Sequence, residues 1–320
     1  MAKEFDLLPA LRAKAVDLGN DGAATGAAWR ERKIERPARG GAKDHADHGS
    51  LSRGGGRSTS AAVPELFDMK LRALRRDRAA RTGPELFLYQ RAFEDCLDRL
   101  SLVQRRFDRA LLLGSPDPSW TERLREFAGD VDARDPGPLF AKHAGGQIIV
   151  EDAWEPPEAA YDLILAVATL DSVNDLPLAL QLIRYAMCPS GLFMGALSGG
   201  ATLPQLRMAM RAADAVSGAA APHIHPRIEP SALSPLLAAA GFIDAVVDVD
   251  RATVSYASLH RLVADLRAMA VTNILAARPR FVGRKARAAA MSAFAAAGDG
   301  SRTAEKFEIL HFAAWTPAKD

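Results

Sequence analysis

The feature that most constrains the fold is a short apolar run, Leu111 to Leu113, which ends in Gly114 and leads into a polar, helix-opening segment at Trp120. This order of residues predicts a strand, a turn and a helix. In an open α/β sheet, ligands bind beside the carboxyl ends of the strands, and the first strand-to-helix turn often presents backbone N–H groups to a cofactor. We therefore expect an α/β protein built around this turn.

Downstream of the turn, short apolar segments alternate with helical ones, the pattern of a parallel sheet with crossover helices. One segment, 161–167, is continuously apolar, as in a strand that is buried on both faces. Two helical segments, at 258–277 and 280–297, separate the last two strands and predict a small helical insertion. The other strands are expected at 129–133, 147–150, 192–197, 242–250 and 306–315.

The first 62 residues contain little apolar periodicity and predict a disordered N-terminal extension. A histidine pair at 44–48 and a glycine run at 53–57 lie within it, but no strand or helix is expected to orient either of them, so neither predicts a metal or phosphate site. Folded character begins near Val63. The basic run at 70–78 then predicts an amphipathic helix with a positive, solvated face, and a contact with an acidic partner or ligand is the alternative.

Composition excludes several classes of function. The net charge of +2, from 41 basic and 39 acidic residues, favours neither a nucleic acid nor an anionic membrane as partner. Two cysteines, Cys96 and Cys188, cannot form a disulfide framework or a cysteine metal site. Cys96 lies on the apolar stripe of an expected helix and is interpreted as a buried hydrophobic residue. No apolar run approaches the ~18 residues that span a bilayer. We expect a cytoplasmic protein without a metal centre or transmembrane segment.

Several segments carry a resemblance to a known family. The fourth strand, the turn before the fifth strand (188–193) and the turn before the sixth (239–242) resemble those of class I S-adenosylmethionine-dependent methyltransferases. More narrowly, the chain resembles the branch of the mitochondrial complex I assembly factor with a methyltransferase fold, near the malonyl-carrier-protein O-methyltransferases. The resemblance covers about residues 63–317. The segments that carry it, in the family's order, are Phe67-Asp68, Val173-Asn174-Asp175-Leu176-Pro177, residues 199–207, Pro222-His223-Ile224, residues 265–269 and Phe307-Glu308-Ile309.

This resemblance implies a Rossmann-like, seven-stranded α/β sheet in the order 3-2-1-4-5-7-6, with helices on both faces and the last strand antiparallel. It implies that S-adenosylmethionine binds at the carboxyl ends of the first four strands. An acidic residue after the second strand would hold the ribose hydroxyls; Asp132 is our choice, with Asp130 and Asp135 as alternatives. The positions that the resemblance assigns to the cofactor are Gly114, Ser115, Asp132, Asp152 and Ala166.

The same resemblance implies a protein or carrier-linked substrate, with a respiratory complex I subunit as one expected partner. The related assembly factor is understood to hydroxylate an arginine rather than to methylate it. Residues expected to contact a substrate are Asn174, His223 and Tyr256. His225 and Arg227 lie in the same loop as His223 and are also candidates, and scaffolding of that loop is the other interpretation of each.

The first turn departs from the family pattern. The family has Asp-Leu-Gly-Cys-Gly-x-Gly, whereas this chain has Leu112-Leu113-Gly114-Ser115 followed by Pro116-Asp117-Pro118. Each proline removes an N–H, and Asp117 adds negative charge near the place of the cofactor's carboxylate. The sequence therefore predicts weak or absent cofactor binding and names no catalytic residue. Two functions remain open: a methyltransferase-like enzyme with a degenerate cofactor loop, and a non-catalytic assembly protein that keeps the fold.

Overall fold

The computed structural model describes residues 65–279 and 281–319. The predicted N-terminal extension, residues 1–62, and the two motifs within it lie outside the described residues. Among the helices of the described ranges, none combines the length and the apolar character needed to cross a bilayer.

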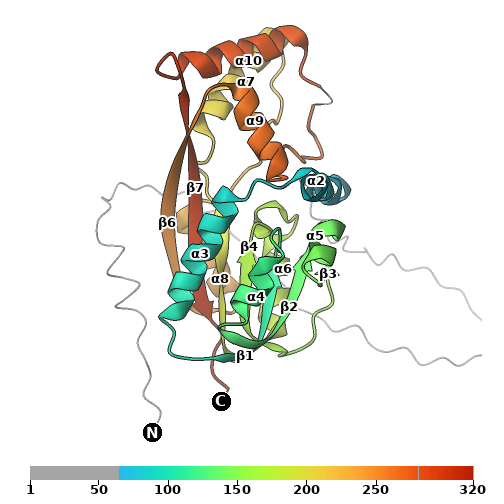
Figure 1. The fold of residues 1–320 in the computed structure, drawn as a ribbon, viewed down its shortest axis with the longest axis vertical. Coiled ribbons are helices and arrows are strands. Elements are labelled where there is room, and N and C mark those ends of the chain that lie inside the picture. The colour runs from blue at the N-terminus through green and yellow to red at the C-terminus, as the bar shows by residue number, and fades with distance from the viewer. Residues whose placement is uncertain (1–64, 280, 320) are drawn as a thin grey trace, which may run out of the picture. The chain divides into compact units, whose positions relative to one another are not determined.

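Seven strands form one sheet in the order β3-β2-β1-β4-β5-β7-β6 (Figure 1). β1 to β5 pair in parallel, and β7 is antiparallel to both β5 and β6. This topology confirms the predicted fold class and strand order. The strands are β1 (Phe107–Leu113), β2 (Ala128–Asp135), β3 (Gln147–Ile148), β4 (Tyr161–Val167), β5 (Met187–Ser198), β6 (Ile243–Tyr256) and β7 (Thr303–Trp315).

Helices cover both faces of the sheet, and the apolar side chains on the two faces of β4 pack against them. Ile164 packs in one apolar cluster with residues of α6 and α8, whereas Leu163 and Leu165 pack in another with residues of α3 and α4. Cys96 of α3 belongs to the second cluster, is 1 % exposed as predicted, and burial raises the pKa of its thiol to about 12. These helices are α3 (Phe87–Ser101), α4 (Ser119–Leu124), α6 (Leu176–Ala186) and α8 (Pro230–Ala239).

A separate helical layer extends beyond the sheet, where α7 (Pro204–Ser217), α9 (Leu259–Ala268) and α10 (Arg284–Ala296) pack against the long ends of β6 and β7 (Figure 1). α9 and α10 are the predicted insertion between the last two strands. Two shorter elements lie near the other strand ends: α5 (Pro138–His143) after β2 and a 3₁₀ turn (Leu170–Ser172) after β4. The remaining helix, α2 (Met69–Thr82), contacts α5.

Some strands are longer than predicted. β2 continues past residue 133 to Asp135, because Leu112 and Leu113 of β1 stay in register with Ala133 and Arg134. α7 begins at Pro204, after Leu203 in a left-handed conformation (φ 62°). Just before it, the Thr202 hydroxyl donates to the carbonyl of Glu308 and accepts from its N–H, which joins the start of α7 to β7.

Candidate functional site

The carboxyl ends of β1, β2 and β4 meet at one edge of the sheet, where the strand order reverses on the two sides of β1. This is the position at which open α/β sheets bind their ligands. The chain leaves β1 at Gly114, β2 at Asp135 and β4 at Ala168. Glu151, three residues after β3, is buried at the same edge.

The turn after β1 lies tightly against its neighbours. Gly114 has a φ of 82°, and a Cβ atom there would lie 1.9 Å from the carbonyl oxygen of Val167, so only glycine fits. The N–H of Ser115 donates to Oδ2 of Asp135 at 2.8 Å. Pro116 is buried, and neither Pro116 nor Pro118 has an N–H to offer. The donor at Ser115 is therefore used inside the protein.

Arg76 of α2 fills the space beside this turn. Its Nε donates to Oδ1 of Asp135 at 2.7 Å and its Nη2 to Oδ2 at 2.5 Å, which is a bidentate pair. Its Nη1 donates to the carbonyl of Ala168 at 2.9 Å. Asp135 also accepts from the N–H of Gly137 at 2.6 Å. With four donors in place, both oxygens of the Asp135 carboxylate are occupied.

Arg72, one helical turn before Arg76, makes the equivalent pair with Glu151. Its Nη1 donates to Oε2 at 2.7 Å and its Nη2 to Oε1 at 2.8 Å. The same Nη2 donates to the carbonyl of Thr169 at 2.6 Å, and the Thr169 hydroxyl donates to Glu151. In both pairs the arginine and the acid are at most 5 % exposed. The carboxyl ends of β2 and β4 and the segment after β3 are thus joined through α2.

The Asp135 carboxylate favours the charged form of the buried Arg76 guanidinium. Burial alone would lower the pKa of Arg76, but the neighbouring Asp135 carboxylate outweighs it, and the net pKa lies above the ordinary value. Paired charges of this kind tolerate burial because each satisfies the other's hydrogen-bonding groups. Removing either member would leave a buried charge without a partner.

α2 buries charged residues and exposes an apolar one, the reverse of the usual arrangement in a surface helix. Arg72, Arg76 and Ala79 are its buried residues and lie on one face, at the spacing of successive helical turns, whereas Leu74 is 62 % exposed. Asp68 caps the helix by accepting from the N–H of Leu71 at 2.9 Å. The prediction that the basic face of this helix is solvated was wrong for Arg72 and Arg76.

The residues at this edge do not fit S-adenosylmethionine. Ribose hydroxyls need a free carboxylate, and the carboxylate that ends β2 is occupied by Arg76. The cofactor's carboxylate needs backbone N–H donors, and the loop provides two prolines and a Ser115 N–H that Asp135 accepts. A cofactor would have to displace two buried ion pairs that the chain supplies from its own helix.

Of the other positions expected to bind the cofactor, Asp152 follows Glu151 at this edge, and Ala166 pairs with Leu113 near the ends of β4 and β1. Asp132 lies in the middle of β2, where it accepts from Arg109 Nη2 at 2.7 Å and from the Tyr161 hydroxyl at 2.8 Å; because β2 is longer than predicted, Asp135 ends the strand. Asp130 is exposed farther back on β2. Asp152 accepts from the N–H of Asp175 just before α6. Ala166 is buried within β4.

The residues expected to contact a substrate are held by internal contacts. Asn174 accepts from the N–H of Phe67 at 2.7 Å and donates to its carbonyl at 3.1 Å. The ring of Phe67 in turn lies 5.2 Å from that of His225, whose Nε2 accepts from the N–H of Ile274 at 2.9 Å. His223 Nε2 lies 2.7 Å from Oδ1 of Asp214, and Tyr256 is buried in the helical layer. Asn174 and His225 are thus linked through Phe67, whereas His223 and Tyr256 have other partners or surroundings.

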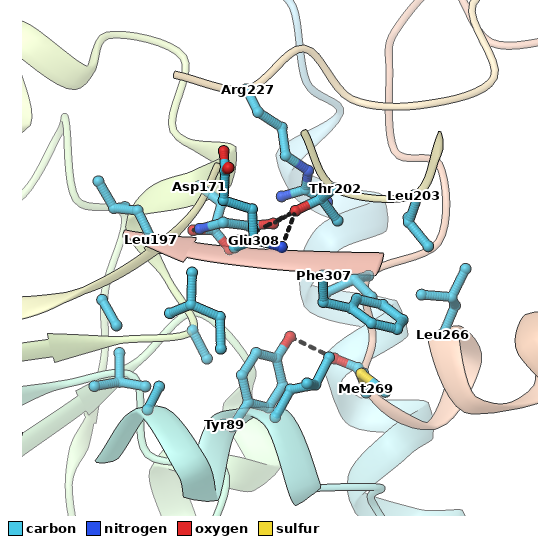
Figure 2. A pocket seen from close by; sticks show the side chains of 18 residues that line it. Tyr89, Asp171, Leu197, Thr202, Leu203, Arg227, Leu266, Met269, Phe307 and Glu308 are labelled. Atoms are coloured by element: carbon cyan, nitrogen blue, oxygen red, sulfur yellow. Dashed lines mark hydrogen bonds between the residues drawn. The ribbon is translucent and has the colours of Figure 1, made fainter. Parts of the chain in front are cut away.

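A cavity of about 60 Å³ lies on the β5 and β7 side of the edge, between the sheet and the helical layer (Figure 2). Ala168, whose carbonyl accepts from Arg76, contributes to its wall. Of the sequence candidates only Arg227 lines it. Sequence reasoning missed Arg72, Arg76 and Glu151. Two features of the sequence could have indicated them. Two arginines lie one turn apart on a helix with few apolar residues, and acidic residues stand at or after the ends of the predicted strands.

Comparison with known proteins identifies the relatives of this chain. No family model matches it. It is 30 % identical over 295 residues to the mitochondrial arginine-hydroxylase NDUFAF5 of Rattus norvegicus, covering 83 % of this chain and 84 % of that protein. It is 33 % identical over 180 residues to the malonyl-[acyl-carrier protein] O-methyltransferase of Xylella fastidiosa, covering 54 % and 58 %.

Among solved structures, the YcgJ protein of Bacillus subtilis matches with a TM-score of 0.47 at 10 % identity, over 71 % of this chain and 99 % of that one. The extent and identity of the match to the rat protein, together with the sheet order, confirm the resemblance inferred from the sequence. The chain belongs to the family of the arginine-hydroxylase NDUFAF5 and has the seven-stranded fold of the class I methyltransferases.

Proposed function

We propose that this chain is a partner-binding protein of the NDUFAF5 family that works without S-adenosylmethionine. The observation that carries the proposal is the pair of buried bridges, Arg72 to Glu151 and Arg76 to Asp135. In these bridges the arginines of α2 use the acidic groups that a cofactor would need at this edge. The prolines of the turn after β1 support the same conclusion, because they remove N–H donors from the loop.

The partner that we propose is a protein, such as a respiratory complex I subunit during its assembly. The rat relative is named for the hydroxylation of an arginine, and the branch that the sequence resembles contains a complex I assembly factor. In this proposal the chain holds the partner and transfers no methyl group.

Calorimetric titration of the full chain with S-adenosylmethionine and S-adenosylhomocysteine tests the cofactor half of the proposal. The malonyl-carrier-protein methyltransferase of Xylella fastidiosa serves as the positive control. We expect saturable heat from the control and none from this chain. Saturable binding that Asp135→Asn weakens would contradict the proposal and favour the second function, a cofactor-dependent methyltransferase.

Deletion of the gene in its source cells tests the partner half. We expect the level of assembled respiratory complex I to fall and to recover when the wild-type gene is returned, measured as NADH-dependent quinone reduction in membranes. An unchanged level of complex I in the deletion strain would contradict a role in its assembly.

A further inference from the structure

The cavity between the sheet and the helical layer has an unusual composition. Most of its wall is apolar and comes from elements far apart in sequence, including Leu88 of α3, Val167 at the end of β4, Leu266 of α9 and Phe307 of β7. A few polar side chains join them, and Figure 2 shows Asp171, Thr202 and Arg227 near one another. The cavity therefore combines an apolar hollow with one positively charged group, Arg227.

The other polar side chains of the wall have partners. The Tyr89 hydroxyl donates to the carbonyl of Met269 at 3.0 Å, and Asp171 Oδ1 accepts from the N–H of Ser198 at 3.0 Å. The Ser198 hydroxyl donates to that of Thr202, which in turn donates to the carbonyl of Glu308. The Glu308 carboxylate accepts from the N–H of Ala201 and lies 3.4 Å from Arg251.

Arg227 differs from all of these side chains. Its Nε is buried and has no hydrogen-bond partner, and within residues 65–279 and 281–319 its guanidinium forms neither a hydrogen bond nor an ion pair. Burial lowers the pKa of Arg227, and Asp171, the acid that most opposes this effect, is not in contact with it. Arg227 as a whole is half-buried, but a buried guanidinium N–H without an acceptor is costly, so a site of this kind is suited to an anion.

We propose that this cavity binds a short-chain monocarboxylate, with its carboxylate on the Arg227 guanidinium and its carbon chain against the apolar wall. A guanidinium presents parallel N–H donors that match a carboxylate. Asp171 and Glu308 in the same wall would repel a second negative charge, which disfavours a phosphate dianion. Arg207 donates to the carbonyls of Gly200 and Thr202 and adds positive charge near Arg227. This additional positive charge favours the binding of one anion.

The size of the cavity limits the carbon chain. About 60 Å³ accommodates a few non-hydrogen atoms, since one water molecule needs roughly 10–15 Å³ on the same kind of measure. Acetate and propionate have the right size. The same chemistry is present in the side chains of aspartate and glutamate, so the carboxylate can come from a free acid or from a protein.

Titration of the full chain with sodium propionate, against sodium chloride at equal ionic strength, tests the site by calorimetry and by thermal denaturation. Propionamide is the neutral control ligand, because it keeps the shape and lacks the charge. Arg227→Gln is the test variant, and Arg211→Gln, at an exposed arginine of α7, is the matched control. We expect saturable propionate binding to wild type and Arg211→Gln, and binding weakened about tenfold or more in Arg227→Gln.

The folded state of Arg227→Gln should be about as stable as wild type without ligand, because the variant removes a half-buried charge whose Nε–H has no acceptor. Propionate binding that is absent, equal to that of propionamide, or unchanged in Arg227→Gln would overturn the proposal. N-acetyl-aspartate amide identifies the source: binding as tight as propionate supports a protein side chain, and binding of the free acids alone supports a small-molecule ligand. This site does not depend on whether the cofactor edge is closed.

Discussion

Two arginines determine what the edge of this sheet can bind. A carboxylate at the end of β2 is the usual partner of a nucleoside ribose in folds of this type, but here Asp135 receives two hydrogen bonds from Arg76 and two from backbone N–H groups. Glu151 is engaged in the same way by Arg72. At the residue scale, what the edge can bind depends on whether Asp135 and Glu151 are paired with these arginines.

Replacement of Arg76 by Met measures how firmly the pair holds the edge. Asp135 would remain buried without its cation, so we expect the free energy of unfolding to fall by about 3–5 kcal/mol. Urea denaturation of the variant beside Arg78→Met provides the measurement. Arg78 is exposed on the same helix, and its replacement should change stability by no more than about 0.5 kcal/mol. Equal losses in the two variants would show that the bridge is not structural.

His225 gives the folded state a dependence on pH. Its burial, with the nearby Arg227, Arg75 and Arg72 charges, lowers its pKa from 6.5 to about 3, so the folded protein keeps the ring neutral to accept from Ile274 N–H. Below pH 6.5 the unfolded chain binds a proton that the folded chain does not. The contribution of His225 to stability should therefore be constant above pH 6.5 and fall by up to about 1.4 kcal/mol per pH unit below it.

Urea denaturation of wild type and His225→Gln between pH 7.5 and about 5 measures this dependence. Glutamine can accept from the same N–H without titrating, so its stability should change less over this interval. Equal slopes for the two proteins would assign the pH dependence to other groups.

At the scale of elements, α2 is the decisive helix. Its N-terminal approach is fixed by Asn174, which holds the backbone of Phe67, and its C-terminal half contacts α5. Asp77 of the helix accepts from the N–H of Leu139 at the start of α5. These contacts set the depth at which the two arginines enter the edge.

Gly137, at the turn between β2 and α5, tests how closely α2 approaches. Its φ of −91° suits any residue, but a Cβ atom there would lie 2.6 Å from Cβ of Arg76. We expect Gly137→Ala to destabilise the protein by about 1–3 kcal/mol in thermal denaturation. Gly283, which has no neighbour within 4 Å of its added Cβ and a φ of −60°, is the control, with an expected change of at most about 1 kcal/mol. A tolerated Gly137→Ala would mean that α2 lies farther from the turn.

Periodicity in the sequence predicted where the strands and the helical insertion lie, because these depend on local apolar patterns. The order of the strands in the sheet came from the family resemblance. β4, expected at 161–167, is observed there. The role of Arg72 and Arg76 was not predictable in this way. Their acidic partners lie 79 and 59 residues away, and a basic helix face is normally solvated. Asp132 does not lie at the edge of the sheet, because β2 continues for three more residues and ends at Asp135.

At the scale of the whole molecule, the sheet of a methyltransferase fold is complete, while two arginines of α2 pair with the acids at its ligand edge. This pairing leaves the helical layer and its cavity intact.

The Arg76 Nε–H signal in a ¹⁵N-labelled protein tests this account most directly. The group is buried and bonded to Asp135, so its signal should persist against exchange with water, whereas that of the exposed Arg78 should be lost. Addition of excess S-adenosylmethionine should leave the Arg76 signal unchanged in position and intensity. A signal that exchanges as fast as that of Arg78, or one that shifts saturably with S-adenosylmethionine, would contradict a closed cofactor edge.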